Sequence, residues 1–227
     1  MAGGHEILAQ EFRVKDQDLV FREIPEGERA HYSKRTVDVE FQYPFGQKEL
    51  YGLAYRTDYD LTQHAKHSGA DLTYTDTDTK ETFLPHVVEP SMGLERSVLV
   101  ALLSAYHEEQ APTAEAGETD SRVVLKLPKH LAPIQVAVLP LSKKDELSSV
   151  AAKLAQDLRS HFTVEYDDTQ SIGKRYRRQD EIGTPYCVTV DFDSLNDKAV
   201  TVRERDSMKQ ERVAMAEIAT YLKLQFA

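Results

Sequence analysis

Alternation of apolar and polar residues marks the first predicted strands. From Thr36 to Tyr43 the residues at odd positions are apolar and those at even positions are polar, which is the period of a half-buried strand. A turn sequence follows at residues 44–47, and residues 49–55 are predicted to return as the second strand of an antiparallel hairpin. A second hairpin is predicted from residues 72–74 and 82–84. A third strand, residues 85–89, leads into a Pro/Gly turn.

A helix is predicted after that turn, over about residues 94–105. Apolar residues there recur at helical spacing and cover almost the whole circumference: Leu94, Val98, Leu99, Ala101, Leu102, Leu103 and Ala105. A helix that is apolar all round is expected to be buried, so we expect it behind an antiparallel sheet. Residues 107–121, rich in Glu, Ala and Thr, are expected to form an exposed loop or insertion. Residues 125–133, with two prolines, are predicted to connect two domains.

The second half of the chain alternates strand and helix patterns. Strands are predicted at residues 134–139 and 162–166, and a hairpin is predicted from residues 186–190 and 199–203. Helices are predicted around residues 147–158 and 174–181, and a closing helix carries Ala214, Ile218, Tyr221 and Leu222 on one face. This order predicts an α/β domain with a mixed sheet over residues 131–227, after a first domain over residues 1–130.

Composition narrows the class of protein. Of 227 residues, 41% are hydrophobic and 29% charged, as in folded proteins rather than disordered ones. No apolar run reaches the roughly 20 residues needed to span a bilayer, and the first residues lack the pattern of a secretory signal. The single cysteine, Cys187, lies in an apolar stretch and rules out an internal disulfide or a CxxC zinc site. These features predict a cytoplasmic protein without a membrane anchor.

The charge balance argues against a protein that coats nucleic acid by bulk electrostatics. The net charge is −10 and the pI is about 5.3, whereas such domains usually have a pI above about 9. One basic run, Lys174-Arg175-Tyr176-Arg177-Arg178, stands out locally. Another local cluster, Asp60, His64 and His67, falls on one helical face and offers metal-ligating side chains, although structural hydrogen bonding is the favoured interpretation.

The most specific motif is Glu89-Pro90-Ser91-Met92-Gly93-Leu94-Glu95-Arg96, a strand, a tight turn and a helix that opens with Glu-Arg. It resembles motif 3 of the class II aminoacyl-tRNA synthetases, which spans about residues 85–106 here. Further segments resemble glycyl-tRNA synthetase of the α2 type in the same order along the chain: residues 30–33, 49–52, 56–61, 67–69, 138–142, 173–185 and 201–206. The resemblance covers the chain from about residue 21 to near its end.

The resemblance implies a reaction and a set of partners. ATP activates glycine to glycyl-adenylate, and the glycyl group then moves to the 3′ end of glycine tRNA. The implied fold is α/β of the α+β kind: part of a class II antiparallel sheet with a buried helix, followed by an anticodon-binding domain. The implied glycine-binding residues are Glu89, Pro90, Ser91, Met92 and Gly93. The implied ATP-binding residues are Glu49, Leu50, Gly93, Leu94, Glu95 and Arg96.

These residue types suit that chemistry. A carboxylate such as Glu89 can hold the substrate ammonium by charge-assisted hydrogen bonds. Glu49 offers a hard oxygen ligand for Mg²⁺ on the ATP phosphates, and no structural metal is expected. Arg96 has a planar guanidinium that stacks on an adenine ring. A tRNA-facing position is predicted for Lys174, Arg175, Arg177 and Arg178.

The chain departs from the family pattern at its beginning. Motif 1, which builds the family's homodimer interface, and motif 2, which supplies an arginine for the α-phosphate, are not found in it. We therefore expect the chain to be inactive alone as a glycine–tRNA ligase. The alternative is a non-catalytic relative that binds tRNA or other nucleic acid, comparable to the synthetase-like accessory subunit of a DNA polymerase. Intact residues at the ATP and glycine positions favour the first hypothesis.

Overall fold

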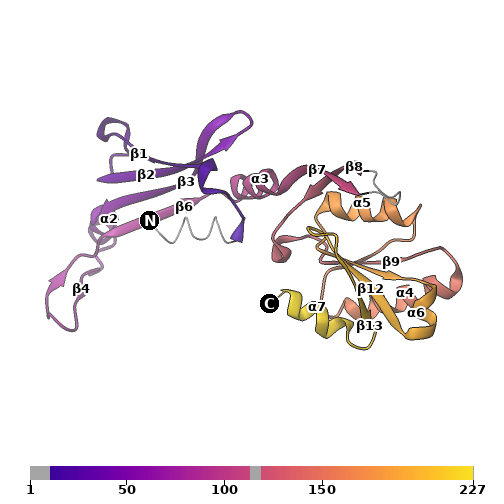
Figure 1. Ribbon diagram of the computed structural model, residues 1–227. Helices are drawn as coiled ribbons and strands as arrows, with labels where there is room; N and C mark the ends of the chain where they lie inside the picture. The colour runs from indigo at the N-terminus through magenta and orange to yellow at the C-terminus, as the bar shows by residue number, and fades with distance from the viewer. Residues whose placement is uncertain (1–10, 113–118, 227) are drawn as a thin grey trace. The chain divides into compact units, whose positions relative to one another are not determined.

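The computed structural model describes residues 11–112 and 119–226. Its contacts divide the chain into two compact units. Among the described residues, the N-terminal unit comprises Val14–Leu103, and the C-terminal unit comprises the residues from Ser104 onward together with residues 11–13 (Figure 1). No helix in these described ranges is both long and apolar enough to cross a membrane.

The N-terminal unit is built on a four-stranded antiparallel sheet in the order β1-β2-β3-β6. Its strands are β1 (Leu19–Glu23), β2 (Arg35–Tyr43), β3 (Gly46–Thr57) and β6 (Val87–Met92), and short 3-10 turns flank β1 at Asp16–Asp18 and Glu26–Glu28. The alternation in β2 works as predicted, because Val37, Val39, Phe41 and Tyr43 are all buried. Between β3 and β6 the chain forms helix α2 (Tyr59–Ser68) and the small hairpin β4 (Tyr74–Thr75) and β5 (Thr82–Phe83).

Helix α3 (Leu94–Ala105) forms where the sequence predicts it, but the expectation that it is buried all round is wrong. One face, with Ser97, Val100, Ala101 and Ala105, is buried. The opposite face is exposed and apolar, with Leu94, Val98, Leu99 and Leu102 between 36% and 75% accessible. The periodicity correctly reports apolar character, but the described chain provides no element to cover that second face.

The C-terminal unit contains a five-stranded mixed sheet in the order β10-β9-β11-β12-β13. Its strands are β9 (Val136–Pro140), β10 (Val164–Tyr166), β11 (Tyr186–Val190), β12 (Ala199–Glu204) and β13 (Gln210–Ala214). Strand β9 pairs in parallel with β10 and β11, and the remaining pairs are antiparallel. The helices are α4 (Asp145–Leu158), α5 (Ile172–Ile182), α6 (Phe192–Asp197) and α7 (Ile218–Phe226).

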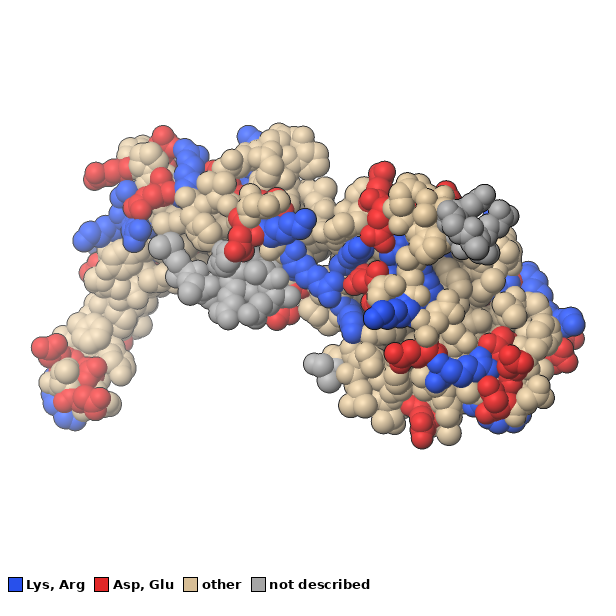
Figure 2. Space-filling model, viewed as in Figure 1, with Lys and Arg blue, Asp and Glu red and all other residues tan. Residues whose placement is uncertain are grey.

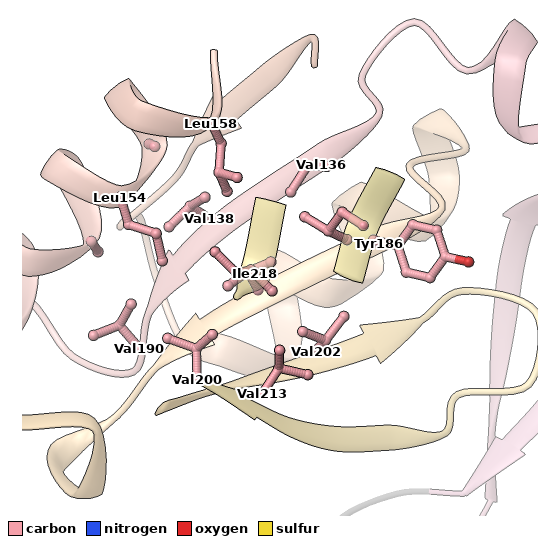
Figure 3. Close-up of a cluster of buried hydrophobic side chains, with 14 of the residues drawn as sticks. Val136, Val138, Leu154, Leu158, Tyr186, Val190, Val200, Val202, Val213 and Ile218 are labelled. Atoms are coloured by element: carbon pink, nitrogen blue, oxygen red, sulfur yellow. The ribbon is translucent and has the colours of Figure 1, made fainter. Parts of the chain in front are cut away.

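The hydrophobic core of this unit lies against the inner face of the mixed sheet (Figure 3). Valines of β9 and β11 meet Leu154 and Leu158 of α4 there, while Ile218 of α7 packs against β12 and β13. Two elements differ from the sequence prediction. The hairpin connection at residues 194–197 is part of α6, which is capped by Asp191, and Ala214 ends strand β13 instead of lying in the closing helix.

The expected loop at residues 107–121 is instead a hairpin of β7 (Tyr106–Pro112) and β8 (Thr119–Leu125). The polar composition suggested a loop because the strands of this hairpin bury only alternate residues. Residues 113–118 lie outside the described part of the chain. The hairpin packs with the C-terminal unit, whereas the sequence assigned it to the first domain. A short 3-10 turn at Lys129–Leu131 follows it.

A buried ionic cluster attaches this hairpin to the unit. Arg122 of β8 is fully buried and donates to Asp180 at 3.2 Å and to the carbonyl oxygen of Arg205 at 3.0 Å. Asp180, on α5, also accepts from both Nη atoms of Arg203 at 2.9 and 3.1 Å. Buried charges of this kind are tolerated only when each is paired, so these bonds hold the hairpin to the C-terminal unit.

Candidate functional site

The antiparallel sheet brings together residues that are far apart in the sequence. Across β2, β3 and β6, Thr36 pairs with Ala54 and Ala54 pairs with Glu89. The next row along joins Asp38, Gly52 and Ser91. Residues directly opposite each other in a sheet point to the same face. Glu89 and Ser91 therefore share one face with Thr36 and Asp38, and only the small residues Gly52 and Ala54 lie between them.

The same alternation divides the predicted glycine-binding segment. Pro90 and Met92 lie between or beside Glu89 and Ser91 in a regular strand, so their side chains point to the opposite face. They can contribute to a pocket on the Glu89 face only through their backbone. Gly93 ends the segment, and a Cβ added there would have no atom within 4 Å. Nothing in the described chain therefore requires glycine at this position.

Arg96 and Glu49, two predicted ATP-binding residues, are neighbours. Arg96 Nη1 donates to the backbone oxygen of Glu49 and lies 3.8 Å from its carboxylate. Both side chains are about half exposed, at 51% and 49%, so they are available to a ligand. Leu50 is 1% exposed and belongs to the core, so it can serve a nucleotide only through its backbone. Leu94 and Glu95 are exposed at the start of α3.

Two carboxylates converge above Gly52. A Cβ added to Gly52 would lie 3.4 Å from Asp38 Oδ1 and 3.6 Å from Glu49 Oε1. Burial, followed by the nearby charges of Glu49 and Glu40, raises the pKa of Asp38. A cation relieves such crowding of negative charge, and Mg²⁺ prefers carboxylate oxygens together with water and phosphate. The donor set at Glu49 and Asp38 therefore fits Mg²⁺ carried in by a nucleotide. No group of three or more His, Cys, Asp or Glu suited to a metal occurs among the described residues.

Arg56 is a site residue to which sequence reasoning assigned no role. Its Nη1 donates to Glu89 Oε2 at 2.6 Å, while Nε and Nη2 hold both carboxylate oxygens of Asp60 at 2.6 and 2.7 Å. The guanidinium also lies 3.8 Å from the ring centroid of Tyr32. These contacts fix Arg56 on three sides and leave Glu89 Oε1 for another donor. The helical i,i+4 rule does not apply to this pair, because Arg56 lies at the end of β3 and Asp60 in the first turn of α2.

The same contacts involve Asp60, which the sequence placed with His64 and His67 in a candidate metal cluster. Helix α2 forms over these residues, but both oxygens of Asp60 accept from Arg56. These hydrogen bonds lower the pKa of Asp60. Asp60 therefore serves to hold Arg56, in agreement with the structural interpretation.

Only one residue of the basic run on α5 is buried in the fold, since Lys174 is exposed and Arg177 and Arg178 are partly exposed. Arg175 is 1% exposed and donates to the carbonyl oxygens of Pro140, Asp168, Thr169 and Gln170. Arg175 therefore cannot face tRNA, contrary to the prediction. Arg178 pairs with Asp167, and Arg177 is 4.0 Å from Asp120, whereas Lys174 is exposed. On the face shown in Figure 2, acidic and basic side chains both occur across the C-terminal unit.

Cys187 has no chemical role in this site. It is 1% exposed within β11, and burial raises the pKa of its thiol to about 12. A thiol that stays protonated at neutral pH is a poor nucleophile. The residue therefore behaves as a small apolar core residue.

Comparisons with known proteins show what the chain is similar to. Residues 135–225 match the family described as the anticodon binding domain. Glycine–tRNA ligase from Corynebacterium efficiens is 56% identical over 212 residues, which are 92% of this chain and 46% of that ligase. The enzyme of the same name from Streptomyces coelicolor is 53% identical with the same coverage. In structure, prolyl-tRNA synthetase from Cryptosporidium parvum, solved with L-proline and AMP, matches with a TM-score of 0.64 at 15% identity, over 97% of this chain and 44% of that one.

The chain thus has the mixed α/β fold of the class II aminoacyl-tRNA synthetases, and its residues 135–225 match the anticodon binding domain family. Within that class it is homologous to the glycine–tRNA ligases over 92% of its residues. The chain spans about half the length of these relatives, since it covers 46% of each.

Proposed function

We propose that this chain is the portion of a glycine–tRNA ligase that binds ATP and glycine on its sheet and the anticodon of glycine tRNA through its C-terminal domain. One observation carries the proposal: Arg96 at the start of α3 bonds to Glu49 of β3, and Glu89 and Ser91 lie on the adjacent strand β6, which suits an adenylate with its adenine at Arg96 and its amino group at Glu89. The sequence relatives named glycine–tRNA ligase support this choice of amino acid.

Each residue has a role that follows from its position. Arg96 stacks its guanidinium on the adenine ring, since it is exposed at the start of α3 and is oriented by the Glu49 carbonyl oxygen. Mg²⁺ bound near Glu49 and Asp38 would neutralise charge on the ATP phosphates. Glu89, held by Arg56, accepts hydrogen bonds from the glycine ammonium. Ser91 adds a polar contact from the same face.

Activation joins the glycine carboxylate to the α-phosphate and releases pyrophosphate. A cation at that phosphate stabilises the charge that develops there, and removing such a group costs about a hundredfold or more in rate. The resemblance assigns this task to a motif 2 arginine, which is not found in the described chain. We therefore propose that the chain needs the remaining half of a ligase for activity, and that the reaction takes place in the cytoplasm.

The test is a chimera that joins the unmatched half of the Corynebacterium efficiens ligase to this chain. We expect the chimera, but not the chain alone, to catalyse glycine-dependent exchange of pyrophosphate into ATP. Arg96→Ala in the chimera should raise the KM for ATP strongly, and Arg96→Lys should rescue it poorly because an ammonium cannot stack as a plane. Arg159→Ala, on the exposed end of α4, is the matched control.

The opposite outcomes are equally informative. Exchange by the chain alone would contradict the need for a second half. A folded chimera without exchange would favour the alternative, a non-catalytic tRNA-binding relative. Anticodon recognition is tested separately by titrating the chain with anticodon stem-loops of glycine tRNA, in which the second and third anticodon bases are substituted. Equal affinity for all stem-loops would remove specific recognition from the proposal.

A further inference from the structure

Three aromatic side chains form a cluster beside the guanidinium of Arg56. The guanidinium carbon lies 3.8 Å from the centroid of the Tyr32 ring. The His31 ring meets the Tyr32 ring edge-on at 5.3 Å between centroids, and it meets the Tyr59 ring in the same way at 5.4 Å. We name His31, Tyr32 and Tyr59 the aromatic bracket; all three belong to the N-terminal unit. The bracket thus places an aromatic face against the cation that holds Glu89.

The ring that stacks on Arg56 is anchored to strand β3. Tyr32 lies in a tight turn over residues 30–33, which closes with a backbone hydrogen bond of 2.9 Å. The backbone nitrogen of Lys34 then donates to the carbonyl oxygen of Tyr55 at 2.8 Å. Tyr55 directly precedes Arg56 in β3. The backbone therefore ties the turn to the strand beside the guanidinium.

Helix α2 holds the other side of the bracket. Tyr59 is the first residue of α2, and its hydroxyl lies 3.1 Å from Nε2 of His31, within hydrogen-bonding distance. The next residue, Asp60, accepts from Nε and Nη2 of Arg56 at 2.6 and 2.7 Å. The first turn of α2 therefore fixes both the rings and the cation that stacks on them.

The ring and the carboxylate of Asp60 restrain different motions of the guanidinium. The two hydrogen bonds to Asp60 fix one edge of the plane, but they allow the plane to tilt about that edge. Nη1 lies off that edge and donates to Glu89 Oε2 at 2.6 Å, so a tilt would displace this hydrogen bond. The Tyr32 ring blocks the tilt, and the attraction between a cation and an aromatic face favours the stacked orientation.

We infer that Tyr32 is a positioning residue for glycine binding that acts through Arg56 on Glu89, an inference that rests on the proposed function. Glycine has no side chain to hold, so its binding depends on how well its ammonium and its carboxylate are met. A carboxylate that is already oriented binds an ammonium without the cost of ordering a mobile side chain. In this role Tyr32 acts on the guanidinium and not on the substrate.

The first experiment measures glycine-dependent pyrophosphate exchange in the chimera. We expect Tyr32→Leu, which removes the ring, to raise the KM for glycine about threefold or more and to leave the KM for ATP unchanged. Tyr32→Phe should keep the KM for glycine, because the ring makes the contact with Arg56. Phe192→Leu is the matched control, since the Phe192 ring also lies against a cation, 4.9 Å from Lys144 Nζ, but in the C-terminal unit.

A double-mutant cycle separates positioning from a general loss of structure. Once Arg56→Met has removed the guanidinium, Tyr32→Leu should no longer change the KM for glycine, because the ring then has no cation to orient. An equal effect of Tyr32→Leu with and without Arg56 would overturn the inference, and so would an unchanged KM for glycine in Tyr32→Leu alone. In both cases the proposed function stands.

A second experiment uses the 227-residue chain by itself and needs no activity. The Nε–H signal of Arg56 is recorded by NMR with isotope-labelled arginine and identified by its loss in Arg56→Met. A ring stacked on the guanidinium shields this proton, so Tyr32→Leu should move the signal downfield and Tyr32→Phe should not. A signal that stays in place in Tyr32→Leu overturns the inference whatever the chimera does. A folded chimera without exchange would instead overturn the proposed function, and the inference with it.

Discussion

Arg56 and Glu89 form a 2.6 Å hydrogen bond between β3 and β6, although they are 33 residues apart in the chain. Asp60 holds the other side of the same guanidinium. Because Glu89 is only half exposed, at 43%, its orientation is set by Arg56 rather than by solvent. A carboxylate fixed in this way is ready to receive an ammonium group without reorganisation.

This relationship predicts how glycine binding responds to substitution. In the chimera, Arg56→Met should raise the KM for glycine about tenfold or more, since a hydrogen bond to a charged group contributes roughly 1.5–3 kcal/mol. The KM for ATP should change little. Arg35→Met is the control, because Arg35 also pairs with a glutamate, Glu23, but on the exposed part of the sheet. Equal effects of Arg56→Met on both substrates would refute a specific positioning role.

We expect substitution of Gly183 to lower the stability of the fold strongly. It ends α5 with a φ of +84°, and a Cβ there would lie 2.9 Å from the Leu125 carbonyl oxygen. The left-handed conformation and the backbone contact together should make Gly183→Ala cost about 2–4 kcal/mol in the free energy of unfolding. Gly173→Ala, in the same helix with nothing within 4 Å, should be neutral or stabilising by up to about 1 kcal/mol. Urea unfolding measures both, and similar values would contradict the steric argument.

Because Asp180 bonds to residues of both elements, we expect the β7–β8 hairpin and the mixed sheet to unfold together. It is 1% exposed and accepts from the buried Arg122 and Arg203. Asp180→Ala would leave the buried Arg203 without its carboxylate and Arg122 with Glu109 alone, and we expect a loss of about 3–5 kcal/mol. The exposed Asp193 gives the control Asp193→Ala, with a change within about 0.5 kcal/mol. By the same reasoning, a fragment that starts at residue 104 should be more stable than one that starts at residue 133. Equal stability of the two fragments would show that the hairpin is dispensable.

We expect Asp191 to account for part of the stability that the C-terminal unit loses in acid. Burial alone would raise the pKa of Asp191, but hydrogen bonds from Arg212 and Ser194 outweigh burial and lower it below 3.8. A carboxyl whose pKa is lowered by folding stabilises the fold above its unfolded pKa and loses that contribution as pH falls through the folded pKa. The free energy of unfolding should therefore fall below about pH 4. Asp191→Asn should weaken the fold at pH 7 and flatten its decline in acid; an unchanged decline would assign the acid sensitivity to other carboxyls.

Residue periodicity predicted most of the strands and helices. Strand β9 and helix α4 form because their apolar residues have the spacing that each element buries. The motif at Glu89–Arg96 likewise indicated the class of fold before any contact was known. Patterns of this kind are local, so they can be read from neighbouring residues in the chain.

Periodicity failed where burial depends on distant partners. Helix α3 is apolar all round, yet half of its surface is exposed, because burial requires a second element that the pattern cannot reveal. Residues 107–121 look like a polar loop, yet Arg122 at the adjoining strand is buried by its pairing with Asp180, 58 residues later. The basic run on α5 suggests an RNA contact, but Arg175 is occupied by the carbonyl oxygens around it.

The sequence by itself determined the elements, their order and the residue types that suit ATP, glycine and tRNA, since these depend on local spacing and on composition. Only the tertiary structure decided that Arg56 holds Glu89 and that Thr36 and Asp38 share a face with Ser91. The physical reason is that the register of antiparallel strands sets which distant side chains meet, and a shift of one residue would turn each of them to the other face.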